Sequence, residues 1–132
     1  MPLSVDLVSP ERVLLSVEAS MVLARTLGGG DIAFLPGHAP FIGALANWTV
    51  HIRTVDGNDE TASVHGGFIE VSNDKVKILS NLAELSSQID VERARAAKER
   101  AEEVLRRGHD AEAEAALKRA HVRLRAAGML VD

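Results

Sequence analysis

The spacing of apolar residues changes once along this chain, near Asp90, and this change most constrains the fold. Before it, apolar and polar residues alternate in short runs such as LSVDLV at 3–8, the period of a half-buried strand. After it, apolar residues recur every three or four positions, the period of an amphipathic helix. We therefore predict an α+β (mainly β) fold, with a β-sandwich or barrel over 1–86 and a two-helix hairpin over 87–132.

Turn residues divide the N-terminal part into strands. The runs VLLSVEA and MVLART are predicted as two strands that meet at Ala19-Ser20. Asp56-Gly57 and Asn73-Asp74 each join two alternating runs, which predicts two hairpins. Gly66-Gly67 indicates a bulge or a close backbone approach. About eight to ten such strands favour a sandwich or a barrel.

Two helices are predicted after Asp90, which is a good N-cap. Arg106-Arg107 would end the first helix, where cations suit the helix dipole. Gly108-His109-Asp110 makes a tight break, so the helices should pack antiparallel, with Asp110 capping the second. Mostly alanine stripes bury little area and predict a weakly packed, movable hairpin. The expected stripes are Val91, Ala94, Ala97 or Lys98, Ala101, Val104 and Leu105, then Ala113, Ala116, Leu117, Ala120 and Leu124.

Composition excludes several classes of protein. The chain has 132 residues and no cysteine, which rules out disulfides, thiolate catalysis and Cys-ligated zinc. No apolar run is long enough to span a bilayer, and we expect no signal peptide because no basic segment precedes an apolar run. Residues 1–89 carry ten acidic and five basic side chains, and 90–128 carry eight and ten. This asymmetry predicts two different surfaces but is too weak to predict nucleic-acid binding.

No catalytic or metal-binding motif is present. The five histidines form neither an HxH nor an HExxH pair, so we predict no metal site. A GxSxG elbow is absent, and LGGGD at 27–31 precedes a strand instead of a helix, unlike a phosphate-binding loop. We expect no catalytic residues and no ATP hydrolysis by the chain alone.

Four segments occur in an order that is hard to match by chance: GD and LPGHAPF within 30–41, GGFIEV at 66–71, IDVERA at 89–94 and ALKRA at 116–120. With them the chain closely resembles the epsilon subunit of the bacterial F-type ATP synthase, over almost its whole length, from about Leu3 to Leu130. One departure is Ala33, where many members have glycine after the acidic residue.

The resemblance implies a ten-stranded β-sandwich followed by two helices. It also implies a non-catalytic rotor-stalk subunit that needs no cofactor and couples rotation of the c-subunit ring to ATP synthesis. The implied partners are the gamma subunit, the c ring, and the alpha and beta subunits when the helices extend and inhibit ATP hydrolysis. The subunit would lie peripherally on the cytoplasmic face of the bacterial cell membrane, reaching the membrane only through the complex.

The family's functional residues can be carried over by position. The ring-facing loop corresponds to Gly28-Gly29-Gly30-Asp31, and the rotor-facing segment to Pro36, Gly37 and His38. The alternative is that both loops only connect strands. These residues form the implied rotor and c-ring interface: Gly29, Gly30, Asp31, Pro36, Gly37 and His38.

Some members bind ATP as a regulatory ligand through an I/L-D-x-x-R-A motif, which residues 89–94 reproduce. An antiparallel hairpin could bring four guanidinium groups together, a donor set suited to phosphate oxygens. The alternative is that Asp90 is only an N-cap and the arginines a solvated face. A freestanding nucleotide-sensing module is the competing function. The implied ATP-binding residues are Glu84, Ile89, Asp90, Arg93, Ala94, Arg100, Arg119 and Arg123.

Overall fold

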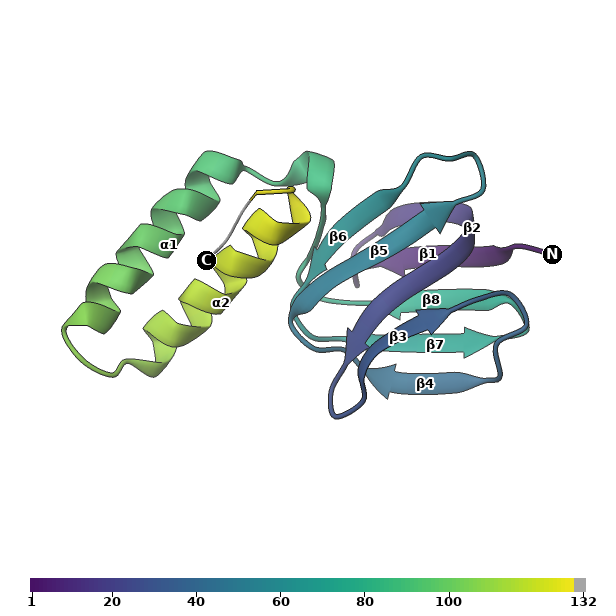
Figure 1. Ribbon diagram of the computed structural model, residues 1–132, viewed down its shortest axis with the longest axis horizontal. Helices are drawn as coiled ribbons and strands as arrows, with labels where there is room; N and C mark the ends of the chain where they lie inside the picture. The colour runs from purple at the N-terminus through teal and green to yellow at the C-terminus, as the bar shows by residue number, and fades with distance from the viewer. Residues whose placement is uncertain (130–132) are drawn as a thin grey trace.

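The computed structural model describes residues 1–129, which form a sandwich of strands followed by two helices (Figure 1). The last residues of the range 87–132, including Leu130, lie outside the described residues. The elements are β1 (Leu3–Val8), β2 (Val13–Thr26), β3 (Gly30–Phe34), β4 (Phe41–Ala44), β5 (Trp48–Thr54), β6 (Glu60–Val64), β7 (Phe68–Ser72), β8 (Lys75–Leu79), β9 (Ala83–Leu85), the 3-10 turn η1 (Ser86–Gln88), α1 (Val91–Arg106) and α2 (Ala111–Ala126).

The strands form one folded sheet in the order β4-β7-β8-β1-β2-β5-β6-β9, and β3 adds to β2. β1 pairs with β8 in parallel, whereas the other named strand pairs are antiparallel. The long β2 pairs with β1 through its first half and with β3 and β5 through its second, so it joins the two layers of the sandwich (Figure 1). The fold class predicted from the two periodicities is therefore confirmed.

The described chain has nine strands, one fewer than the ten that the resemblance implies. The runs VLLSVEA and MVLART, predicted as two strands, form the single strand β2. The register with β5 shifts between Ala19 and Met21, which marks a bulge. A bulge lets one strand bend from one layer to the other without ending. The apolar alternation is therefore interrupted at the bulge although the strand continues through it.

Alternating apolar residues from both layers fill the core of the sandwich. Leu3, Val5 and Leu7 of β1 are fully buried, and Val76 and Ile78 of β8 pack in the same cluster. The complete buried cluster is Leu3, Val5, Leu7, Ala19, Val22, Ala24, Phe34, Leu45, Val50, Ile52, Ala62, Val64, Ile69, Val71, Val76 and Ile78. The period-two pattern therefore predicts the core residues well.

Two turns show why their residues are needed. Asn73 and Asp74 both have positive φ, the geometry of a tight two-residue hairpin, as predicted between β7 and β8. Gly67 has φ of +108°, and a Cβ placed on it would lie 2.1 Å from the Leu79 carbonyl oxygen. The predicted close backbone approach at Gly66-Gly67 is therefore confirmed for Gly67.

Both helix N-caps are confirmed. The Asp90 side chain accepts a hydrogen bond from the Arg93 amide at 3.0 Å, and Asp110 accepts one from Ala113 at 2.9 Å. The two helices lie side by side as a hairpin beside the sandwich (Figure 1). Within residues 1–129, no helix is long and apolar enough to cross a membrane.

The helix α2 is buried on two opposite sides. Ala113, Ala120 and Leu124 recur on one side, as predicted for the contact with α1. Val122 and Ala126 are also buried, and they lie about half a turn around the helix from that stripe. Since α2 also contacts β5 and β6, we assign this second face to the sandwich. The prediction of a single apolar stripe was therefore incomplete.

Candidate functional site

The two helices and the segment leading into α1 enclose an open groove of about 730 Å³. Its apolar wall consists mainly of alanines, whose small side chains let the helices approach each other and leave space above them. The groove is lined by Glu84, Gln88, Asp90, Arg93, Ala94, Ala97, Arg100, Ala101, Val104, Asp110, Glu112, Ala113, Ala116, Arg119 and Arg123. Seven of the eight residues predicted to bind ATP are in this list.

Ile89 is the predicted site residue that the groove does not include. Its side chain is buried, and it directly precedes the N-cap Asp90. We infer that Ile89 anchors the start of α1 against apolar neighbours and does not itself face a ligand. Ala94 is buried in the groove wall, where a larger side chain would fill the space.

Four arginines converge on the groove from both helices. Arg93 and Arg100 come from α1, and Arg119 and Arg123 come from α2. The Arg123 Nε donates to Glu84 Oε1 at 2.6 Å, which ties α2 to β9. Such a cluster is an anion site when the guanidinium groups are not already paired.

Within the part of the chain that the structure describes, two of the four arginines have acidic partners and two do not. Arg119 Nη2 donates to Glu112 Oε1 at 2.9 Å within α2. Arg93 and Arg100 are exposed and make no ion pair with any residue of the described range 1–129. An incoming anion would therefore meet two available guanidinium groups and two that carboxylates already hold.

His65 directly follows β6, and the charges of Glu84 and Arg123 both act on its imidazole. Neither ring nitrogen has a hydrogen-bond partner within the described residues. Burial, reinforced by the positive charge of Arg123, lowers the pKa of His65 to about 4. Glu84 opposes this effect, and Arg119 adds to it. His65 is therefore neutral at physiological pH and packs as an apolar side chain.

The predicted interface residues lie at the two ends of β3. Gly29 lies in the β2–β3 turn and Gly30 and Asp31 begin β3, whereas Pro36 and Gly37 follow β3 at its other end. A five-residue strand separates them by about 15 Å. The structure thus places the two segments predicted to face the c ring and the rotor at opposite ends of β3.

The segment around Pro36 is held by specific contacts. The Gly37 amide donates to Asp74 Oδ1 at 2.7 Å, which fixes this turn to the β7–β8 turn. The His38 Nδ1 donates to the Ala39 carbonyl at 2.7 Å, and its ring packs edge-on against Phe34. These contacts give the segment a defined shape.

Asp31 is already engaged within the sandwich. Arg25 lies opposite Asp31 across the β2–β3 ladder and donates from Nε to Asp31 Oδ1 at 2.8 Å. This hydrogen bond is the main reason that the pKa of Asp31 lies below its ordinary value. Asp31 is still about half exposed, so it can accept from a partner as well.

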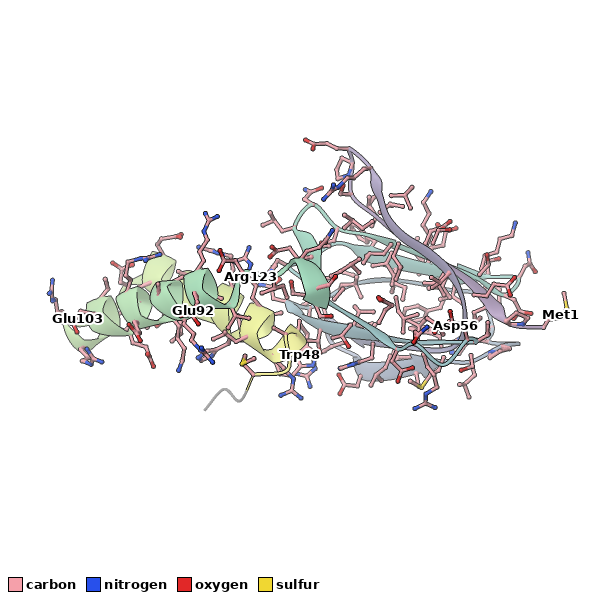
Figure 2. All side chains as sticks on the ribbon, turned by 90° about the horizontal axis from the view of Figure 1, so that it is seen from above. Met1, Trp48, Asp56, Glu92, Glu103 and Arg123 are labelled. Atoms are coloured by element: carbon pink, nitrogen blue, oxygen red, sulfur yellow. The ribbon has the colours of Figure 1, made fainter. Side chains whose placement is uncertain are left out.

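Sequence reasoning missed a group of charged side chains around Trp48. Trp48 begins β5 at the junction of the sandwich and the helices (Figure 2). Arg25, Arg125 and Lys118 lie over its ring. No short motif marks these residues, because they come from three separate elements.

Sequence reasoning also missed an exposed row of apolar side chains on the outer face of the sandwich. Ala44, Phe68, Leu79, Val8 and Val13 are consecutive partners across β4, β7, β8, β1 and β2. Phe68, Leu79 and Val13 are exposed. The alternation along each strand places these residues on the face away from the core, and this pattern could have revealed the row from the sequence.

Within the described residues, no group of three or more His, Asp or Glu side chains is arranged to hold a metal ion. The chemistry that the groove offers is anion binding by guanidinium groups, with carboxylates nearby as hydrogen-bond acceptors.

Together, the fold and the groove define a β-sandwich that carries a basic helical hairpin. Residues 2–86 match the family described as ATP synthase, Delta/Epsilon chain, beta-sandwich domain. Residues 87–128 match the ATP synthase, Delta/Epsilon chain, long alpha-helix domain.

Individual relatives agree with these matches. The ATP synthase epsilon chain of Streptomyces griseus subsp. griseus is 48% identical over 124 residues, which cover 94% of both chains. The epsilon chain of Moorella thermoacetica is 46% identical over 132 residues, covering 97% of this chain and 98% of the relative.

Solved structures show the same fold. One chain of the Euglena gracilis mitochondrial ATP synthase, solved by cryo-EM as OSCP/F1/c-ring in rotational state 1, matches with a TM-score of 0.80 at 23% identity. The match covers 96% of this chain and 81% of that one.

The chain belongs to the ATP synthase delta/epsilon chain family. The family predicted from the four segments is therefore confirmed. Membership makes the chain a non-catalytic subunit of an ATP synthase.

Proposed function

We propose that this chain is a rotor subunit of a proton-translocating F-type ATP synthase, which couples rotation of the c ring to ATP synthesis. The support is its family membership and its likeness to a chain from an assembly that contains F1 and the c ring. The subunit would sit peripherally on the cytoplasmic face of the cell membrane and reach the membrane only through the complex.

The surfaces described above suggest where its partners bind. We assign the β2–β3 turn and the adjoining Asp31 to the c ring, because the half-exposed Asp31 carboxylate can accept from a ring side chain or amide. We assign the gamma subunit to the segment around Pro36 and to the exposed apolar row that includes Phe68. A permanent subunit contact would cover these apolar side chains, which otherwise stay in water.

We further propose that residues 1–86 and 87–132 act as two units, and that the second unit is regulatory. When extended, its helices would contact the alpha and beta subunits and inhibit ATP hydrolysis. The alanine-lined contact between the helices supports this proposal, since a small contact energy allows a modest ligand to shift the populations. Deleting residues 90–132 should raise ATP hydrolysis by the assembled complex, and unchanged activity would contradict inhibition.

The regulatory ligand that the groove fits best is ATP. The observation that carries this proposal is the convergence of four arginines on one groove of about 730 Å³. Phosphate oxygens would pair first with Arg93 and Arg100, which have no acidic partner in residues 1–129. Bound ATP would join α1 to α2 and stabilise the folded hairpin by about 1.4 kcal/mol for each tenfold excess over Kd.

Equilibrium dialysis of ATP with the full chain tests this site. Arg93→Ala should weaken binding about tenfold or more, because a charge-assisted hydrogen bond to phosphate is lost. Arg95→Ala is the matched control, since Arg95 lies on α1 outside the groove and pairs with Glu92. No binding at millimolar ATP, or equal affinity for the Arg93 variant and native protein, would remove the site.

Glu112 provides a test in the opposite direction. Its carboxylate pairs with Arg119 at the groove and would repel a phosphate. Glu112→Gln should therefore tighten ATP binding about threefold. Weaker binding by this variant would show that Glu112 helps to hold the ligand and does not compete with it.

A freestanding nucleotide-sensing module is the second candidate, and the same groove favours it. Co-purification with the alpha, beta and gamma subunits separates the two functions. Both candidates predict ATP binding, but only the rotor subunit copurifies with the synthase.

A further inference from the structure

Three cations from two parts of the molecule converge on the ring of Trp48. The guanidinium carbon of Arg25 lies 3.9 Å from the ring centroid, and that of Arg125 lies 4.6 Å away. Lys118 Nζ lies at 4.7 Å. Attraction to the ring favours each cation, but the three positive charges also repel one another over these short distances.

Only two of these contacts hold α2 on the sandwich. Lys118 and Arg125 belong to α2, whereas Arg25 lies on β2 and Trp48 on β5. The contacts of Lys118 and Arg125 therefore cross the interface, and they flank the buried α2 residue Val122. Arg25 contributes nothing attractive across the interface and places a like charge where α2 must dock.

Asp31 offsets this repulsion. It pairs with Arg25 at 2.8 Å, and the positive charge of Arg125 also lowers the pKa of Asp31, after the larger effect of the Arg25 hydrogen bond. The carboxylate thus acts on a cation from each side of the interface. It remains ionised at neutral pH and balances part of the charge around Trp48.

We propose that Asp31 controls how firmly α2 docks on the sandwich, by balancing the cations that converge on Trp48. A partner cation or hydrogen-bond donor that takes over the Asp31 carboxylate would leave Arg25 and Arg125 less screened and loosen α2. Contact at the β2–β3 turn would thereby favour release of the helical hairpin.

The consequence for the rotor rests on the proposed contact between Asp31 and the c ring. The control of docking does not, because it is a property of the isolated chain. Experiments on the isolated chain therefore test the docking control separately from the proposed function.

Hydrogen exchange of the α2 amides in the full chain measures docking directly. Trp48 is the only tryptophan, so quenching of its fluorescence by acrylamide gives a second readout. Asp31→Asn should accelerate exchange in α2 about threefold to tenfold and make Trp48 easier to quench. Asp59→Asn is the matched control, because Asp59 is exposed in the turn at the far end of β5 and should leave both readouts unchanged.

The variant Arg25→Gln separates charge balance from simple loss of an ion pair. It breaks the same pair but removes a repelling cation and leaves Asp31 to attract Arg125. Exchange in α2 should therefore stay at the native rate or become slower. Adding Arg25→Gln to Asp31→Asn should bring exchange back toward the native rate.

High salt should reduce the difference between Asp31→Asn and native protein, because ions screen these exposed charges. Equal acceleration by Asp31→Asn and Arg25→Gln would overturn the proposal, since the pair would then only brace the β2–β3 turn. Native exchange and quenching in Asp31→Asn would overturn it as well. Exchange in the core strands reports whether each variant keeps the sandwich intact.

Discussion

The sandwich and the helical hairpin bury their apolar residues in different ways. The sandwich core contains fully buried Leu, Ile, Val and Phe side chains from both layers. The contact between the helices rests on alanines such as Ala101 and Ala120. Burial of a large aliphatic side chain contributes about 1.5–3 kcal/mol, whereas an extra methyl group contributes about 0.8 kcal/mol.

This difference separates a rigid scaffold from a part whose position can be controlled. The hairpin depends on side chains at its edges: the Glu84–Arg123 pair at the groove and the cations on Trp48 at the sandwich. Figure 2 shows Arg123 and Trp48 near the same end of the hairpin, where it meets the sandwich. Polar contacts of this kind respond to ligands, salt and pH, which a hydrocarbon core does not.

The largest expected effect is on the sandwich and comes from Gly67→Ala. Its Cβ would collide with the Leu79 carbonyl oxygen, and its positive φ is strained for any residue with a side chain. We expect a loss of more than about 4 kcal/mol in the free energy of unfolding, measured with urea. Gly57→Ala is the control, because Gly57 has a similar positive φ but open space around its Cβ position, and it should cost only about 1 kcal/mol. Equal losses in both variants would contradict the close approach.

The contrast between the two regions predicts that truncating a side chain lowers the free energy of unfolding by different amounts in the two. Ile69→Ala removes a fully buried core side chain and should cost about 3 kcal/mol. Ala101→Gly removes a methyl group from the helix contact and should cost about 1 kcal/mol, mostly through helix propensity. Hydrogen exchange should show the first loss throughout the strands and the second mainly in α1 and α2. A cost for Ala101→Gly as large as that for Ile69→Ala would remove the distinction.

The smallest expected effect is a pH dependence at the junction of the two regions. The pKa of His65 falls from 6.5 to about 4 on folding, so only the unfolded chain takes up this proton between those values. As pH falls through this window, the free energy of unfolding should decrease, by roughly 1 kcal/mol or less in total, because His65 is only partly buried and solvent screens its charge. His65→Leu removes this titratable group. The urea midpoint of unfolding should therefore change less with pH in the variant than in native protein between pH 7 and 4.5, roughly the window that the shift defines. If the urea midpoint changes with pH equally in native protein and variant, the pH dependence belongs to other groups.

Much of the fold follows from local patterns in the sequence. Alternation identifies the core strands, Asn73-Asp74 identifies a hairpin, and Asp90 and Asp110 identify the helix starts. These features act over a few residues, so they can be recognised without knowing what lies nearby in space. The nine strands fall within the eight to ten that the pattern predicts, but the division of β2 into two strands was wrong, because its bulge looks like a break when only the sequence is considered.

The candidate groove was predictable for a related reason. Helical periodicity and the tight break at Gly108 place Arg93 and Arg100 opposite Arg119 and Arg123 in an antiparallel hairpin. The carboxylate partners of the last two could not be predicted, because Glu84 reaches Arg123 across 39 positions of sequence and Glu112 reaches Arg119 by choice of rotamer.

The two periodicities can be recognised in the amino-acid sequence, and they predict the core of the sandwich and the helices, while four short segments predict the family. Which face of α2 meets the sandwich, and which charges meet there, depends on how the elements pack in three dimensions. Arg25, Asp31, Trp48 and Arg125 come from four elements, and their contacts depend on strand order and on the position of α2. Electrostatic interactions depend on distance in space, which local sequence patterns do not specify.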